Sequence, residues 1–304
     1  NTSGFKNTYF YYPLPDYKMP QVIYSEKYLP KNGSLDSWIP YYSMNNNSMI
    51  SDEKRLYNDI SDNNVFEFFA NSFLVECSID NNKLGEVDYA VSSPFRKSEF
   101  DIITTHSYKN GFCKTATDKS ISLLNTIDSN HKALALRGLH TCKTNINGNT
   151  LASETITGTS LTQLLIDAYK TRVTDNVYHI LDKLYDEIKK SSDSSDTLNS
   201  IFNSTKELTL DVLDKNDKLL ANGFIDMIHK NCFVDKEGNY IWIDQEWCFN
   251  DIPASYVLFH NIVELYSSNS WLNSYITIKQ IFKHYNLNNK TTCYFNVKKA
   301  IFNT

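Results

Sequence analysis

The chain has 304 residues, a formal net charge of −5, and 41% hydrophobic and 21% charged residues. This composition is typical of a globular protein with a full-sized core, and the length fits two domains or one large bilobal domain. The acidic balance argues against a general nucleic-acid binder, which normally has a basic surface. No apolar run of about 18 residues predicts a transmembrane helix, and no signal peptide opens the chain. Because the chain begins with Asn1, we expect it to be a piece of a longer protein.

The chain contains 6 cysteines, and none of them are spaced as a zinc-binding pair would be. A protein of this size does not need disulfides to build a stable core. We therefore expect reduced thiols in a reducing cytosol.

The first 64 residues are expected to be mostly extended. Residues 1–50 are rich in tyrosine and proline, and the prolines between residues 11 and 20 exclude a helix there. A short helix is predicted over 51–64, because Ser-Asp-Glu at 51–53 is typical of a helix start.

Residues 65–157 have the pattern of a β-rich lobe. The segment 66–77 is apolar and aromatic, and residues 87–91, 100–106 and 112–116 are expected to form three antiparallel strands in series, with a tight turn predicted by Lys-Asn-Gly at 109–111. Apolar residues at helical spacing predict a helix over 117–131. Two further strands are expected, at 132–142 and 149–156, joined by the Asn-Gly turn at 147–148.

From residue 159 onward the apolar spacing is helical. The whole pattern predicts an α+β fold. A small antiparallel β lobe with one helix (65–157) precedes a larger α-helical lobe (158–304). We expect a cleft between the two lobes, because such clefts are common ligand sites.

The segment 221–250 is the most informative part of the sequence. Two strand-like pieces, 232–234 and 240–243, flank the polar turn 235–239 and predict a β-hairpin. This hairpin would bring Asp226, Asn231 and Asp244 to one end.

The spacing of these three residues resembles that of the protein-kinase catalytic loop and its metal-binding aspartate. In phosphoryl transfer a carboxylate orients the attacking hydroxyl, while amide and carboxylate oxygens hold Mg²⁺ against the nucleotide phosphates. The order of elements agrees with such a layout, since a β lobe with Lys114 in its third strand precedes the three residues.

The same segment, with its tail Trp247-Cys-Phe-Asn-Asp-Ile-Pro253, resembles the kinase-like modules of bacterial surface-polysaccharide proteins, and among them the O-antigen kinase–methyltransferases. The resemblance covers roughly residues 65–270 and implies a bilobal protein-kinase-like fold that uses ATP and Mg²⁺. It implies the following roles: Asp226 as catalytic aspartate, Asn231, Asp244 and Glu246 at the metal, Lys114 at the phosphates, and Glu154 to Ile156 as the hinge that meets adenine.

A second resemblance lies at the N-terminus. Gly4-Phe5 and the run from Tyr11 to Pro20 look like the C-terminal end of a class I methyltransferase domain, although the chain has no glycine-rich S-adenosylmethionine loop. We therefore interpret residues 1–64 as a methyltransferase remnant or linker that packs on the kinase-like lobe.

The sequence also departs from the kinase pattern. The glycine-rich loop is replaced by a turn at 92–98, where Ser92 and Arg96 are the candidate phosphate contacts. The predicted helix 117–131 contains no glutamate, so the usual lysine–glutamate ion pair has no obvious partner.

The leading hypothesis is an ATP- and Mg²⁺-dependent phosphotransferase acting on a sugar or glycan hydroxyl in surface-polysaccharide biosynthesis. One alternative is a pseudokinase that serves as a scaffold for an adjoining methyltransferase or glycosyltransferase. Another is a small-molecule kinase of the choline or aminoglycoside type. The resemblance implies a bacterial cytoplasmic location, with peripheral attachment at the inner membrane as a variant of it.

Overall fold

The computed structural model describes residues 4–31, 34–35, 53–80, 83–93, 96–203 and 217–302. They form two compact units. Unit 1 consists of Asn1–Asn125 and Thr144–Thr155, and unit 2 of Thr126–Lys143 and Ile156–Thr304. Helix α3 (Ile121–Leu136) is continuous across the boundary at residue 125. The chain finally leaves unit 1 at Thr155, inside the segment 154–156 that was predicted to be the hinge.

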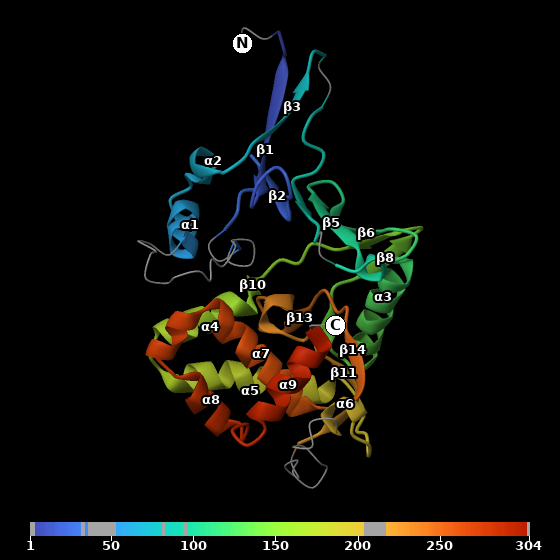
Figure 1. Ribbon diagram of the computed structural model, residues 1–304, viewed down its shortest axis with the longest axis vertical. Helices are drawn as coiled ribbons and strands as arrows, with labels where there is room; N and C mark the ends of the chain where they lie inside the picture. The colour runs from blue at the N-terminus through green and yellow to red at the C-terminus, as the bar shows by residue number, and fades with distance from the viewer. Residues whose placement is uncertain are drawn as a thin grey trace. The chain divides into compact units, whose positions relative to one another are not determined.

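Unit 1 is built on an eight-stranded sheet of order β3-β1-β2-β4-β5-β6-β9-β8, in which every neighbouring pair is antiparallel (Figure 1). Its elements are β1 (Asn7–Leu14), β2 (Val22–Ser25), α1 (Glu53–Asp62), α2 (Phe66–Phe69), β3 (Leu74–Ser78), β4 (Tyr89–Val91), η2 (Ser98–Phe100), β5 (Ile102–Ser107), β6 (Gly111–Ala116), the first part of α3 (Ile121–Leu136), β8 (Thr144–Asn147) and β9 (Thr150–Ser153).

The N-terminal segment contributes two strands to this sheet. Strand β1 pairs with both β2 and β3, and β2 pairs with β4. Apolar side chains of β1 and β2, among them Tyr12, Leu14 and Val22, are buried together with Phe66 of α2. Strands β1 and β2 of the N-terminal segment are therefore part of the sheet. The domain limits at 64 and 157 stay a prediction.

Unit 2 is mostly helical (Figure 1). Its elements are the rest of α3, β7 (His140–Thr141), β10 (Thr159–Ser160), α4 (Leu161–Lys170), α5 (Thr174–Lys190), α6 (Ser200–Asn203), β11 (Leu219–Phe224), η3 (His229–Asn231), β12 (Cys232–Val234), β13 (Tyr240–Trp242), β14 (Cys248–Pro253), α7 (Ala254–Ser268), η4 (Ser270–Ser274), α8 (Ile278–His284) and α9 (Thr291–Phe302). The α+β class, with an antiparallel sheet preceding a larger helical part, is confirmed.

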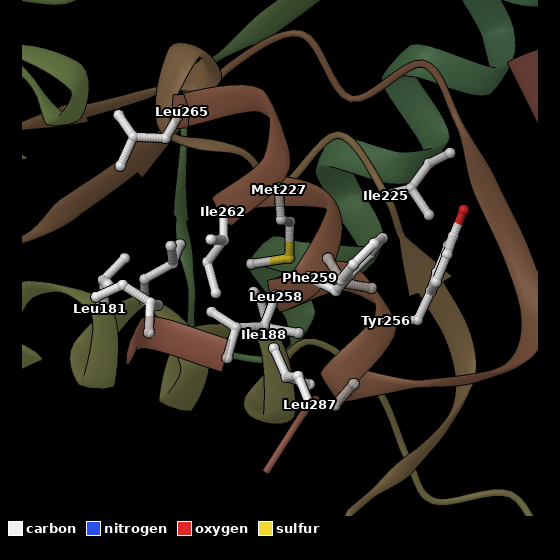
Figure 2. Close-up of a cluster of buried hydrophobic side chains, with 14 of the residues drawn as sticks. Leu181, Ile188, Ile225, Met227, Tyr256, Leu258, Phe259, Ile262, Leu265 and Leu287 are labelled. Atoms are coloured by element: carbon white, nitrogen blue, oxygen red, sulfur yellow. The ribbon is translucent and has the colours of Figure 1, made fainter. Parts of the chain in front are cut away.

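The large core of unit 2 forms where helices α5 and α7 contact each other. In α5 the apolar residues Val177, Leu181, Leu184 and Ile188 recur at helical spacing and are all buried. Figure 2 shows Leu181 and Ile188 in the same cluster as side chains of α7.

Some local predictions are wrong. The predicted strand at 132–142 is helical up to Leu136, because α3 is longer than expected and begins at Ile121. Only His140 and Thr141 form a strand, and β7 pairs in parallel with β13 of unit 2. Residues 66–69 of the apolar segment 66–77, which was expected to have β structure, form the short helix α2, whereas 74–77 lie in β3. Helix α1 agrees with prediction, and its expected start at 51–52 lies outside the described residues.

Among the described residues no helix is long and apolar enough to cross a membrane. All 6 cysteines lie within the described residues, and none of them is in a disulfide.

Candidate active site

The predicted hairpin is present and organises the site. Strands β12 and β13 pair in antiparallel register, with Cys232 opposite Trp242 and Val234 opposite Tyr240. The segment 225–231 enters β12 and the segment 243–247 leaves β13, so the two segments lie at the same end of the hairpin.

Asp226 lies between two buried apolar anchors. Its neighbours Ile225 and Met227 are fully buried, and Figure 2 shows both side chains in the cluster that contains Phe259 and Ile262 of α7. The backbone of this loop is thus fixed by hydrophobic packing on both sides of the aspartate.

Asn231 ties the two aspartates together. Its Nδ2 atom donates to the backbone carbonyl oxygens of Asp226 (3.1 Å) and Asp244 (3.4 Å). Both partners are carbonyl oxygens, which can only accept, so the amide nitrogen must face them and the side-chain oxygen of Asn231 is directed away from them. The structure therefore brings together the three residues that the sequence placed at one end of the hairpin.

The carboxylate of Asp226 is bound to the segment that follows Asp244. Its Oδ2 accepts hydrogen bonds from the backbone amides of Glu246 (2.8 Å) and Trp247 (2.7 Å). Burial, with a smaller contribution from the Asp244 and Glu246 carboxylates, raises the pKa of Asp226 to about 8, although the two amide hydrogen bonds oppose this shift. A carboxylate with a pKa near neutrality is a stronger base than an ordinary aspartate.

Asp244 adopts a left-handed backbone conformation, with φ of +53°. Aspartate and asparagine are among the few non-glycine residues that tolerate this region, and such conformations often mark functional turns. Glu246 follows two residues later, and its side chain is 9% exposed.

Gln245 holds the turn between these two acidic residues. It is fully buried, and its Nε2 donates to the carbonyls of Asp226 (3.0 Å) and Ile243 (2.8 Å). Two residues of α3 also contact the backbone of Gln245. The side-chain amide of Asn130 donates to its carbonyl oxygen (2.9 Å), and Nε2 of His131 accepts from its backbone N–H (3.4 Å). Sequence reasoning missed this support, because only the fold brings α3 next to the turn.

Asn261 of α7 supports the loop from the opposite direction. It is fully buried, donates to the carbonyl of Met227 (3.0 Å) and accepts from the amide of His229 (3.3 Å). A polar residue inside the apolar sequence of α7 was the available signal, since a buried amide must find partners.

His229 is fully buried, and its Nδ1 lies 2.7 Å from the hydroxyl of Thr162 in α4. Burial lowers the pKa of His229 to about 3, so the ring is neutral at physiological pH. This environment favours a structural role for His229 in the loop.

The remaining candidates belong to unit 1 or to the boundary. Lys114 lies in β6, between Thr104 of β5 and Leu151 of β9. Ser92 directly follows β4, and its amide donates to the carbonyl of Gln21 (2.9 Å); Arg96 lies four residues further along the chain. Glu154 follows β9, and Ile156 is the first residue of the second part of unit 2. Their roles at the nucleotide stay predictions.

A metal ion at this site would have to be held by few protein ligands. The described residues contain no group of three or more His, Cys, Asp or Glu that could hold a metal ion. The donor set of Asn231 and Asp244 consists of oxygen atoms and fits Mg²⁺, which is commonly bound by one or two carboxylates together with substrate phosphates and water.

No family model matches the sequence, and no curated protein is significantly similar to it. Among solved structures, the chain is similar to an aminoglycoside phosphotransferase from Streptomyces rimosus, with a TM-score of 0.41 and 10% identity over 65% of this chain and 88% of the other. It is also similar to a macrolide 2'-phosphotransferase from Brachybacterium faecium, with a TM-score of 0.32 and 6% identity over 71% of this chain and 88% of the other.

Proposed function

We propose that the chain is an ATP- and Mg²⁺-dependent phosphotransferase that transfers a phosphoryl group to an alcohol. The observation that carries the proposal is the arrangement of Asp226, Asn231 and Asp244, which share hydrogen bonds at one end of a hairpin. A sugar or glycan acceptor in surface-polysaccharide biosynthesis, and an adjoining methyltransferase or glycosyltransferase, rest on the sequence resemblance.

In this proposal Asp226 orients the acceptor hydroxyl and takes its proton. Its Oδ2 is engaged by two backbone amides, so Oδ1 is the oxygen that would face the hydroxyl. The two amide hydrogen bonds support this role, because they hold the carboxylate in one orientation toward the acceptor.

Asn231 and Asp244 would hold Mg²⁺, with Glu246 as a further contact. The ion would offset the negative charge on the nucleotide phosphates during transfer. Lys114 would contact the same phosphates, Ser92 and Arg96 would lie at the turn that replaces the glycine-rich loop, and Glu154 and Ile156 would flank the adenine.

The first test compares thermal unfolding with ATP in the presence and absence of Mg²⁺. A ligand at 100 times its dissociation constant stabilises a protein by about 2.7 kcal/mol. We expect a Mg²⁺-dependent stabilisation of the wild type that is lost in Asp244→Asn, because the substitution removes the carboxylate but tolerates the left-handed backbone.

Asp251→Asn is the matched control, because Asp251 is also an aspartate of unit 2 with positive φ (+59°). It should retain the full stabilisation.

Asp226→Asn should retain nucleotide binding and lose transfer to sugar alcohols, followed as ADP release. If the wild type shows no Mg²⁺-dependent stabilisation, the proposed nucleotide site is wrong and the scaffold alternative is favoured.

A further inference from the structure

The C-terminal part of the chain has an unusual charge pattern. From Leu265 to Thr304 the sequence contains five lysines and no aspartate or glutamate, although the whole chain has a net charge of −5. A local excess of positive charge in an acidic protein raises the concentration of anions near it.

Two lysines meet at the last acidic residue before this stretch. Lys230 donates to one carboxylate oxygen of Glu264 in α7 (3.4 Å), and Lys298 of α9 donates to the other (2.7 Å). We call Lys230, Glu264 and Lys298 the basic cluster. Their side chains are 35%, 26% and 22% exposed, so the cluster is accessible to a solute.

The basic cluster has a net positive charge. Burial alone would raise the pKa of Glu264, but the hydrogen bond and charge of Lys298 and the charge of Lys230 lower it to about 2. His260 lies 2.9 Å from the Lys298 ammonium, and burial followed by the charge of Lys298 lowers its pKa to about 4. Near neutral pH the group thus consists of two cations, one anion and a neutral imidazole.

The basic cluster is directly linked to the proposed catalytic loop. Lys230 lies in the sequence between Asp226 and Asn231. Glu264 follows Asn261, the residue of α7 that holds the backbone of this loop, by three positions and so lies on the same helix face. An anion bound between the two lysines would therefore lie beside the loop.

An exposed aromatic ring adjoins the cluster. Phe302 is 46% exposed, its ring stacks on His260 with centroids 5.1 Å apart, and the Lys298 ammonium lies 5.1 Å from its centroid. An aromatic face next to a cation offers an apolar surface and a charged group to one ligand.

We propose that the acceptor is an anionic alcohol, such as a sugar that carries a phosphate or a carboxylate, and that Lys230 and Lys298 bind its anionic group. This inference rests on the proposed function, because it names the acceptor class of that site. A cationic acceptor such as an aminoglycoside would be repelled by the same two lysines.

The test is a titration of inorganic phosphate against chloride at equal ionic strength, with thermal unfolding as the readout and with ADP and Mg²⁺ present. Phosphate should stabilise the wild type, and Lys230→Met and Lys298→Met should each weaken this apparent affinity about tenfold, which corresponds to about 1.4 kcal/mol. A cationic aminoglycoside used as a second probe should not stabilise the protein.

The variant Glu264→Gln tests whether the basic cluster binds phosphate or only stabilises the fold. Removal of the carboxylate leaves both lysines without their shared counter-ion, so phosphate should bind more tightly to this variant, whereas a purely structural cluster would predict no gain. Lys189→Met is the matched control, since Lys189 also pairs with a carboxylate, that of Asp186 (2.6 Å), and lies over an aromatic ring, that of Tyr185 (4.6 Å). Its phosphate response should equal that of the wild type.

Three results would overturn the proposal: no phosphate effect in the wild type, an unchanged phosphate effect in Lys298→Met, or loss of MgATP binding instead of phosphate binding in that variant. The last result would assign the cluster to the nucleotide. Repeating the titration without ADP distinguishes this proposal from the proposed function, because phosphate binding that needs the two lysines can persist even if nucleotide does not bind.

Discussion

Unit 2 contains two ionic clusters that differ in burial. In the first, Lys290 pairs with Asp217 at 2.9 Å, and the two side chains are 3% and 2% exposed. The second is the basic cluster, in which one carboxylate shares two lysines that are 22% and 35% exposed.

The buried pair has all its partners within the protein. Asp217 also accepts from the amide and hydroxyl of Ser255 at the start of α7, and Tyr294 lies 2.6 Å from that hydroxyl. The charges balance, and the network joins the residue two positions before β11 to α7 and α9. The basic cluster has unbalanced charge and accessible ammonium groups, so the comparison separates a cluster that holds the fold from one that can receive a ligand.

Removal of one partner from the buried pair should have the largest effect. Lys290→Met leaves the Asp217 carboxylate buried without its cation, and we expect the free energy of unfolding to fall by about 3–5 kcal/mol. Urea denaturation would measure this change. In the double variant with Asp217→Asn the loss should be smaller than the sum of the single losses, and a loss below about 1 kcal/mol for Lys290→Met would contradict the comparison.

His260, which contacts Lys298 of the basic cluster, should make the fold sensitive to acid. The folded-state pKa of His260 is about 4, below its ordinary value of 6.5. Between these two pH values the imidazole is protonated in the unfolded chain but neutral in the folded protein. Stability should therefore fall as the pH drops from about 6.5 to 4. His260→Gln should reduce this slope, measured as melting temperature against pH, and an unchanged slope would show that His260 does not contribute.

An exposed pair should have the smallest effect. Lys132 and Asp128 in α3 lie 2.6 Å apart, but the lysine side chain is 73% exposed. Lys132→Met should change the free energy of unfolding by no more than about 0.5 kcal/mol in the same denaturation experiment, because solvent screens such pairs. A loss comparable to that of Lys290→Met would mean that burial does not separate the clusters.

Local sequence patterns predicted the parts of the fold that depend on interactions between residues close in sequence, such as turns and hairpins. The hairpin 232–242 was predictable because two short apolar strands flank a polar turn. The Asn-Gly turn at 147–148 is also present, but it joins β9 to β8 and not to the predicted strand 132–142. The end of α3 could not be predicted, because the apolar run through Leu134 and Leu136 is compatible with either a strand or a helix.

The candidate site was predictable as a set of residues but not as a supported structure. The predicted hairpin placed Asp226, Asn231 and Asp244 together, since all three adjoin it. The partners that fix them, Asn261 on α7 and Asn130 on α3, are distant in sequence, and a single chain offers no pattern that pairs them with the loop.

The turn that contains Asp244 is neither helix nor strand, yet its backbone is extensively anchored. The amides of Ile243, Gln245, Glu246 and Trp247 all have acceptors within the protein. The conformational entropy of these residues is therefore lost during folding and not when an ion arrives. A cation could dock on a preorganised surface, so its affinity would not be reduced by the work of ordering the loop.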